Sequence, residues 1–190
     1  MSFRLVCLSL LLLLVTAAAA QQSPKAAAVD NAFVQKQFGS TCKLISTPAP
    51  YAGDLDGDGI EDVVVAANCK DPMMDQAEHD FKVVDPYNSF FGYGDPKVTT
   101  AFASEDPSLR GLALLVIHGA GTEAWRSDTP KAKFVIVNLP FKQIMIRKLN
   151  VKKKSVIAIY AEELGGDHLT SATFWDGKKY RYQPMGSTLD

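Results

Sequence analysis

The chain has 190 residues, which is long enough for one domain with a sizeable hydrophobic core. Its 20 basic and 21 acidic residues leave a net charge of −1 at pH 7. This balance excludes a polycationic protein and gives no electrostatic basis for binding nucleic acid or a charged membrane surface.

The N-terminal segment, residues 1–20, has the pattern of a secretory signal peptide. Arg4 provides a short positive region, and Leu5 to Val15 form an apolar run that is too short for a comfortable membrane span. Ala18 and Ala20 then supply an A-x-A cleavage site. An uncleaved membrane anchor is the alternative, and we expect no membrane span in the mature chain.

Cleavage after this segment would leave a secreted or periplasmic protein that begins at Gln21. We expect residues 21–28 to form a flexible leader and residues 29–190 to form a single β-rich domain. An apolar pattern at near-helical spacing from Val29 to Phe38 predicts a short N-terminal helix that ends at Gly39.

The mature chain keeps two cysteines, Cys42 and Cys69, because Cys7 lies inside the apolar run of the signal peptide. In an oxidising compartment, two cysteines most simply form a disulfide. The bond would close a loop of about 28 residues, and the lost entropy of the unfolded chain would stabilise the fold by roughly 3.5 kcal/mol. Two separately buried thiols are the alternative.

Between these cysteines lies the most informative stretch, DLDGDGIEDVVVAA, from Asp54 to Ala67. Its carboxylates recur at alternate positions, and Ca²⁺ takes about six to eight oxygen ligands in flexible loops of this kind. Gly59 occupies the sixth position of the loop, where a sharp turn is required. The predicted calcium ligands are Asp54, Asp56, Asp58, the backbone carbonyl of Ile60, and Asp62. A solvated acidic turn without an ion is the alternative.

The loop differs from an EF-hand, which requires Glu at its twelfth position and a helix on each side. The twelfth position here is Val65, and Val63 to Val65 predict a buried strand. In this form, residues 53–67 resemble a single copy of the FG-GAP/VCBS repeat, the integrin-like calcium-binding motif that reads G-D-x-D-G-D-G-x-x-D before an apolar strand. The resemblance implies a structural Ca²⁺ site and a role in adhesion or recognition.

The segment from Asn68 to Pro96 predicts a long loop with two groups of interest, and its role is left open. The first group could hold a transition metal or simply be solvated, and consists of Asp75, Glu78, His79 and Asp80. The second could form an aromatic binding platform or a satellite core, and consists of Tyr87, Phe90, Phe91 and Tyr93.

Strand patterns dominate the rest of the domain, as β-branched and aromatic runs separated by turn signals. The predicted strands are Thr41–Ile45, Val63–Ala67, Val98–Phe102, Leu112–His118, Lys133–Val137, Gln143–Arg147, Ser155–Tyr160 and Ala172–Trp175. Asp176-Gly177 predicts a hairpin with a two-residue type I′ turn before Tyr180–Tyr182. The basic run at 147–154 is interpreted as a solvated strand edge or turn. We therefore predict a mainly β, single antiparallel-sheet domain, sandwich-like or partial-propeller-like, with one short N-terminal helix.

The sequence identifies no reaction. Leu114 to Gly121, LLVIHGAG, looks like the strand and oxyanion loop of α/β-hydrolases, but the G-x-S-x-G nucleophile elbow is missing downstream. His118 and His168 are therefore expected to be structural. The favoured function is calcium-dependent binding or scaffolding outside the cytoplasm, with an unknown extracellular or periplasmic partner. A secreted hydrolase that uses His118 or the acidic loop at 75–80 is the alternative.

Overall fold

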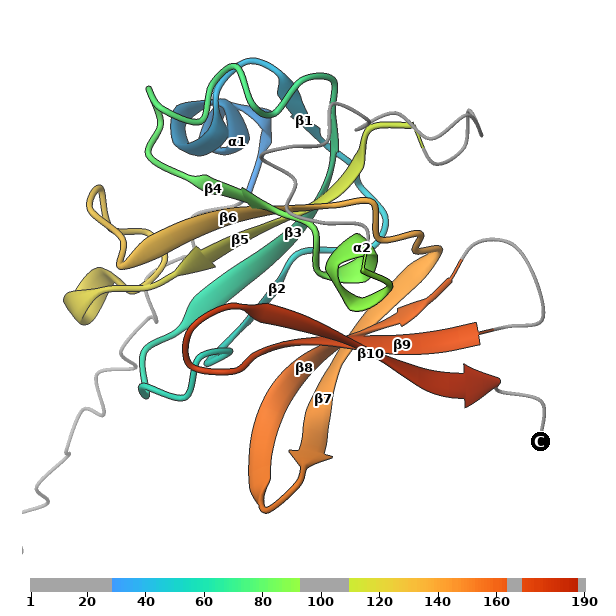
Figure 1. Cartoon of the computed structure of the whole chain (residues 1–190). Helices are drawn as coiled ribbons and strands as arrows, with labels where there is room; N and C mark the ends of the chain where they lie inside the picture. Colours follow the sequence, from blue (N-terminus) through green and yellow to red (C-terminus); the bar gives the residue numbers. More distant parts are fainter. Residues whose placement is uncertain (1–28, 93–109, 164–168, 188–190) are drawn as a thin grey trace, which may run out of the picture.

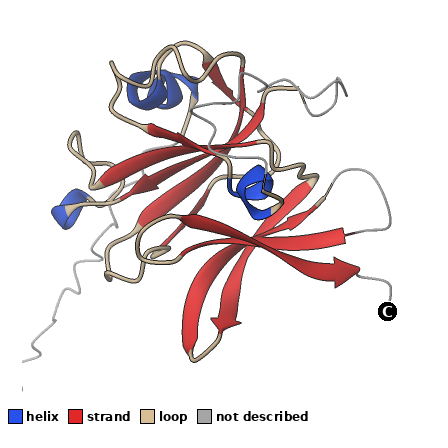
Figure 2. Ribbon diagram, in the orientation of Figure 1, coloured by secondary structure: helices blue, strands red, loops and turns tan. Residues whose placement is uncertain are grey.

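The computed structural model describes residues 29–92, 110–163 and 169–187, and these form a mainly β structure with two sheets (Figures 1 and 2). This confirms the predicted fold class, including the short helix near the N-terminus. Several predicted features lie outside the described residues, namely the signal peptide, the leader, the strand at 98–102, Tyr93 and His168.

The first sheet has six strands: β1 (Cys42–Leu44), β2 (Tyr51–Gly53), β3 (Asp62–Cys69), β4 (Lys82–Val84), β5 (Leu112–His118) and β6 (Ala132–Val137). Its spatial order is β1-β3-β5-β6-β4, and β2 also pairs with β3. All pairs are antiparallel except β4 with β6, which run parallel. The single parallel pair departs from the predicted all-antiparallel sheet, because the chain crosses from β4 to the far side of β6 instead of turning back directly.

The second sheet is an antiparallel meander of β7 (Gln143–Val151), β8 (Lys154–Glu162), β9 (Leu169–Trp175) and β10 (Tyr180–Ser187). The β9–β10 hairpin was predicted, but its turn is longer than the predicted two residues, since Trp175 pairs with Tyr180. Asp176 closes this turn by accepting the backbone N–H groups of Lys178 and Lys179, both at 2.9 Å.

The strand β3 lies in the middle of the fold and is buried on both faces. Val63 and Val65 pack toward α1 (Asn31–Phe38), whereas Val64 and Ala66 pack toward the second sheet. Figure 1 shows α1 on one side of the first sheet and the second sheet on the other. Burial on both faces explains why this strand is a continuous apolar run instead of an alternating one.

Two helical segments and two short strands, β2 and β4, escaped prediction. The segment at 68–96, predicted as a loop, contains β4 and α2 (Pro86–Phe90), and a 3₁₀ turn spans Gly121–Glu123. Such elements are too short to show a hydrophobic period, although Asp85 caps α2 and Pro86 occupies its first turn. None of the helices in the described ranges is long and apolar enough to cross a membrane.

The predicted disulfide is present. Cys42 and Cys69 face each other in the β1–β3 register, and their sulfur atoms are 2.08 Å apart. The bond ties the edge strand β1 to the end of β3 opposite the acidic loop, which leads into β3 at Asp62.

Candidate metal centre

The acidic loop lies at the end of the first sheet where β3 begins, β5 ends and β6 begins. The register places Val63 opposite Ile117 and His118 opposite Ala132, so these three strand ends are neighbours. Asp62, His118 and Lys131 therefore meet at one end of these neighbouring strands, although they are far apart in sequence.

Asp54 folds the loop around its own carboxylate. Its Oδ1 accepts the backbone N–H groups of Gly57 and Asp58, at 2.7 and 3.1 Å, and its Oδ2 accepts that of Gly59 at 2.9 Å. Gly57 and Gly59 have φ values of 80° and 85°, in the left-handed region that glycine adopts without a steric penalty. The predicted glycine turn is thus formed by the protein's own hydrogen bonds.

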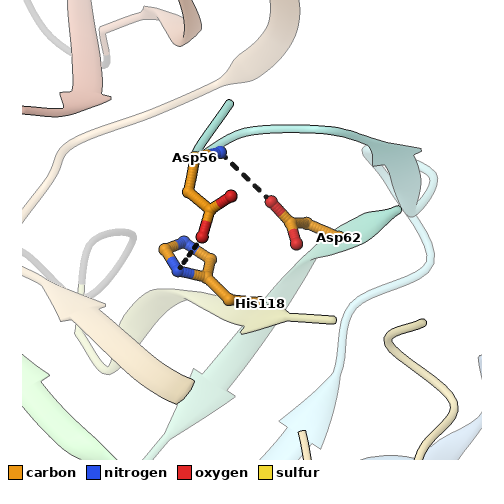
Figure 3. Close-up of side chains that lie close together, drawn as sticks. All are labelled: Asp56, Asp62 and His118. Carbon is orange, nitrogen blue, oxygen red and sulfur yellow. Dashed lines mark hydrogen bonds and ion pairs between the residues drawn. The ribbon is translucent and has the colours of Figure 1, made fainter. Parts of the chain in front are cut away.

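The loop brings potential metal ligands together in two overlapping groups. Ligand atoms of Asp54, Asp56 and Asp58 all lie within 4.8 Å of one another, and so do those of Asp56, Asp62 and His118. Asp56 belongs to both groups, and Figure 3 shows its carboxylate pointing toward His118 beside Asp62. Among the predicted ligands, Asp56 is therefore the residue that links the exposed loop to the interior.

Asp62 is fully buried and anchors the loop. Its Oδ2 accepts the backbone N–H groups of Leu55 at 2.7 Å and Asp56 at 3.3 Å, and its Oδ1 accepts that of Gly119 at 2.8 Å. Burial raises the pKa of Asp62 to about 6, against the opposing effect of the Gly119 and Leu55 hydrogen bonds. Asp62 thus joins both ends of the loop to the end of β5, and its part as a calcium ligand stays a prediction.

Lys131 provides the main positive charge against these carboxylates. Its Nζ lies 2.7 Å from Oδ2 of Asp56 and 2.6 Å from Oδ2 of Asp58, and its side chain is 49% exposed. The hydrogen bonds to Asp56 and Asp58 raise the pKa of Lys131 above its usual range, and the bond from Lys131 lowers the pKa of Asp58. The sequence analysis missed this residue, because no local pattern connects Lys131 to a loop more than seventy positions earlier.

His118 lies in the interior between the two sheets, with only 1% of its side chain exposed. Its Nδ1 is 3.3 Å from Oδ2 of Asp56, and its Nε2 is 2.7 Å from the Tyr180 hydroxyl. Burial lowers the pKa of His118 and raises that of Tyr180 well above its usual value, which favours a neutral imidazole and a protonated phenol. In that state Tyr180 donates to Nε2, and the protonated Nδ1 faces Oδ2 of Asp56.

Aromatic rings surround this imidazole. The ring centroids of Phe134 and Trp175 both lie 5.1 Å from that of His118, and Trp175 also packs on Tyr180. The series Asp56–His118–Tyr180 therefore connects the acidic loop through β5 to β10 of the second sheet. The partners of His118 are a carboxylate and a phenol, and neither supplies the serine nucleophile of a hydrolase.

Gly119 explains the HG pattern at the end of β5. A Cβ atom at this position would lie 2.3 Å from the carbonyl oxygen of Glu61 and 2.8 Å from the backbone nitrogen of Trp125. Glycine is required here because two other backbone segments approach too closely for a Cβ atom, and this close approach also brings its N–H to Asp62.

Three of the remaining candidate residues, Ile60, Asp75 and His79, make other hydrogen bonds. The backbone N–H of Ile60 donates to Oδ1 of Asp58 at 2.9 Å. In the 75–80 segment, Asp75 accepts the Thr41 N–H at 3.1 Å, and Nδ1 of His79 lies 3.2 Å from the Lys36 carbonyl oxygen. Within the described residues, the groups able to hold a metal do not include this segment.

Comparison with known proteins found no protein family, no curated protein and no solved structure that matches this chain. The site is accordingly interpreted from its own chemistry.

Proposed function

We propose that this protein is an exported calcium-binding β-domain that acts in binding or scaffolding outside the cytoplasm. The observation that carries the proposal is the convergence of Asp54, Asp56 and Asp58, whose ligand oxygens lie within 4.8 Å of one another. Carboxylates at such distances repel one another unless a cation or a proton compensates them.

The charges around the loop favour a divalent cation. Lys131 neutralises one of the three converging carboxylates, so two negative charges are left uncompensated in this group. Ca²⁺ prefers carboxylate and carbonyl oxygens, which are the donors that this loop offers. Because Lys131 is half-exposed, its long side chain can turn toward water when the cation binds.

The proposed ligands are Asp54, Asp56, Asp58, the Ile60 carbonyl and Asp62. Asp54 and Asp62 already accept backbone N–H groups, but each carboxylate oxygen has two lone pairs and can accept from an N–H group while it binds a metal. Asp56 and Asp58 depend on Lys131 for their charge compensation and would gain most from the ion.

Calcium in this position would stabilise the fold and take no part in a reaction. Asp56 reaches both sheets through His118 and Tyr180, so a loop fixed by calcium would also fix the contact between the sheets. A site closed by protein oxygens has little room for a substrate. The resemblance to the FG-GAP/VCBS repeat supports a role in adhesion or recognition, and the disulfide and the signal-peptide pattern support export.

A thermal melt with and without calcium tests this proposal. Extracellular calcium modules have dissociation constants near 10⁻⁴–10⁻³ M. With about 0.1 mM for this site and about 1 mM free calcium, binding would add roughly 1.4 kcal/mol of stability and raise Tm by about 3–6 °C. Magnesium should give a much smaller shift, because it demands a tighter octahedron. An unchanged Tm in calcium would leave the stretch as an acidic turn.

The export part of the proposal has its own test. N-terminal sequencing of the mature protein should begin at Gln21. Recovery of the full-length chain in the membrane fraction would contradict it, without bearing on whether the loop binds calcium.

A further inference from the structure

A cleft of about 810 Å³ opens between α2 and the start of β10, away from the acidic loop. Its volume is within the range of small-molecule sites in proteins, roughly 300–1,000 Å³. The helix α2 packs on β10, and Figure 1 shows it above the second sheet, beside the strands β4 and β6. The cleft is therefore formed where the two sheets and this short helix meet.

One wall of the cleft is aromatic. Phe90 and Tyr182 line it, and their ring centroids are 5.4 Å apart. Tyr87 and Phe91 extend the same cluster, each with its ring centroid within 6.1 Å of that of Tyr182. Phe90 and Phe91 are 51% and 50% exposed, so this group is only partly a satellite core and presents open ring faces to water.

The lining of the cleft also contains three positively charged side chains, Lys82, Lys179 and Arg181, and all three residues are exposed. Arg181 donates to Asp176 at 2.5 Å, but no carboxylate of the described residues pairs with the Lys82 or Lys179 ammonium groups. The acidic residue in the lining, Asp85, is buried, and its carboxylate accepts hydrogen bonds from Asn88 and Asn138. The cleft therefore has a positive rim beside its aromatic wall.

We propose that this cleft is a binding site for a small organic anion with a flat apolar body, such as an aromatic carboxylate. The apolar body would pack on Phe90 and Tyr182, since aromatic faces gain from stacked and edge contacts as well as from burial. The carboxylate would lie toward the ammonium groups of Lys82 and Lys179, where charge-assisted hydrogen bonds are available. No residue of the proposed calcium loop lines this cleft, although Tyr180, which does line it, reaches Asp56 through His118.

Titration with 2-naphthoate, followed by NMR in the presence of a calcium chelator, tests the proposal. Neutral 2-naphthamide has the same rings without the charge and serves as the matched probe. We expect saturable, millimolar binding of 2-naphthoate, and about three- to tenfold weaker binding of the amide. The chelator keeps the result independent of the acidic loop.

Two pairs of variants locate the site. The double variant Lys82→Gln/Lys179→Gln should weaken 2-naphthoate binding by about three- to tenfold and leave the amide unchanged, since each rim charge contributes a factor of a few. Lys152→Gln/Lys153→Gln, in the β7–β8 turn, removes two exposed charges outside the cleft and should have no effect. Phe90→Ala should weaken both probes, whereas Met145→Ala, another exposed apolar residue, should weaken neither.

The proposal is overturned if 2-naphthoate fails to saturate. It is also overturned if the acid and the amide bind equally, or if the lysine pair in the cleft behaves like the control pair. Each variant carries only surface substitutions, so a folded protein is expected for all of them.

Discussion

The Lys131 ammonium lies 2.7 Å from Oδ2 of Asp56, and so compensates a carboxylate that the sequence predicts as a calcium ligand. The same carboxylate contacts His118, whose side chain is buried between the sheets. Asp56 thus has an internal partner and an exposed one, and only the exposed one is free to move. This difference leads to the first prediction.

Lys131→Gln should raise the affinity of the loop for calcium by several-fold, because it removes the cation that competes for Asp56 and Asp58. Without calcium, the variant should lose about 1–3 kcal/mol, because Asp56, whose side chain is 2% exposed, is left without this cation. Calorimetric titration and melts in chelator measure the two effects. Lys142→Gln, which removes an ion pair with Glu162, is the matched control. Unchanged or weaker calcium binding by Lys131→Gln would contradict the competition.

Asp62→Ala should destabilise the protein even without calcium. The substitution leaves the backbone N–H groups of Leu55, Asp56 and Gly119 without their acceptor, and a buried donor without a partner costs about 1–3 kcal/mol. Release of the buried charge offsets part of this loss, so we expect a net decrease of roughly 2–4 kcal/mol in urea denaturation with chelator. The 81%-exposed Asp128 provides the control, since Asp128→Ala should cost about 0.5 kcal/mol or less.

The turn between β9 and β10 should give the protein a pH-dependent contribution to stability. Burial acts to raise the pKa of Asp176, but the hydrogen bonds from Arg181, Lys179 and Lys178 outweigh it and lower this pKa below 3.8. The unfolded chain therefore takes up this proton first as the pH falls. The stabilisation by Asp176 is complete well above pH 3.8 and disappears as the pH falls through the lower, folded-state pKa.

Asp176→Ala should accordingly cost about 1–2 kcal/mol at pH 7, with a smaller difference from the wild type near pH 2. Urea denaturation over this pH range measures the difference. Asp71→Ala, at an exposed position outside any strand or helix, is the comparison and should show little difference at either pH. A constant penalty for Asp176→Ala at all pH values would show that its charge is irrelevant.

The double variant Cys42→Ser/Cys69→Ser should lose roughly 3.5 kcal/mol of stability, because its unfolded chain is no longer closed into a loop. Calcium affinity should be retained, since the bond joins the opposite end of β3 from the acidic loop. Urea denaturation and calcium titration of the same variant test both statements. Loss of calcium binding in a variant that is still folded would show that the two ends of β3 are coupled.

Local patterns in the sequence predicted much of the fold. The short helix ends at Phe38 as expected, with the Asp30 carboxylate capping its start, and the strand Leu112–His118 has its predicted bounds. These elements are encoded by residues close together in the chain, namely a cap, a glycine and a β-branched run. The strand β7 extends beyond its predicted end at Arg147, because its polar residues alternate on a solvent-exposed face.

The parts of the site that escaped prediction depend on the pairing of distant strands. The acidic loop was identified from the spacing of its carboxylates, but Lys131, His118 and Tyr180 join it only because β5 ends, and β6 and β10 begin, on this side of the fold. His118 lies at the end of β5, as expected, whereas its contacts with Asp56 and Tyr180 had no local signal. Asp62 shows the same limit. The spacing of the carboxylates predicts Asp62 as a calcium ligand, but no local pattern predicts the buried hydrogen bonds from Leu55 and Gly119 by which it anchors the loop.

Calorimetric titration of calcium into the chelator-treated mature protein tests the central claim most directly. The account predicts one site per chain with a dissociation constant near 10⁻⁴–10⁻³ M, and at least about tenfold weaker binding in Asp56→Ala and Asp58→Asn. Asp58 is exposed, so Asp58→Asn keeps the test valid if the loss of the Asp56–His118 contact disturbs folding. Asp128→Asn should bind calcium as the wild type does. The assignment of this loop as a calcium site would be contradicted if the wild type showed no saturable binding. It would also be contradicted if the Asp56 and Asp58 variants bound calcium as tightly as the wild type.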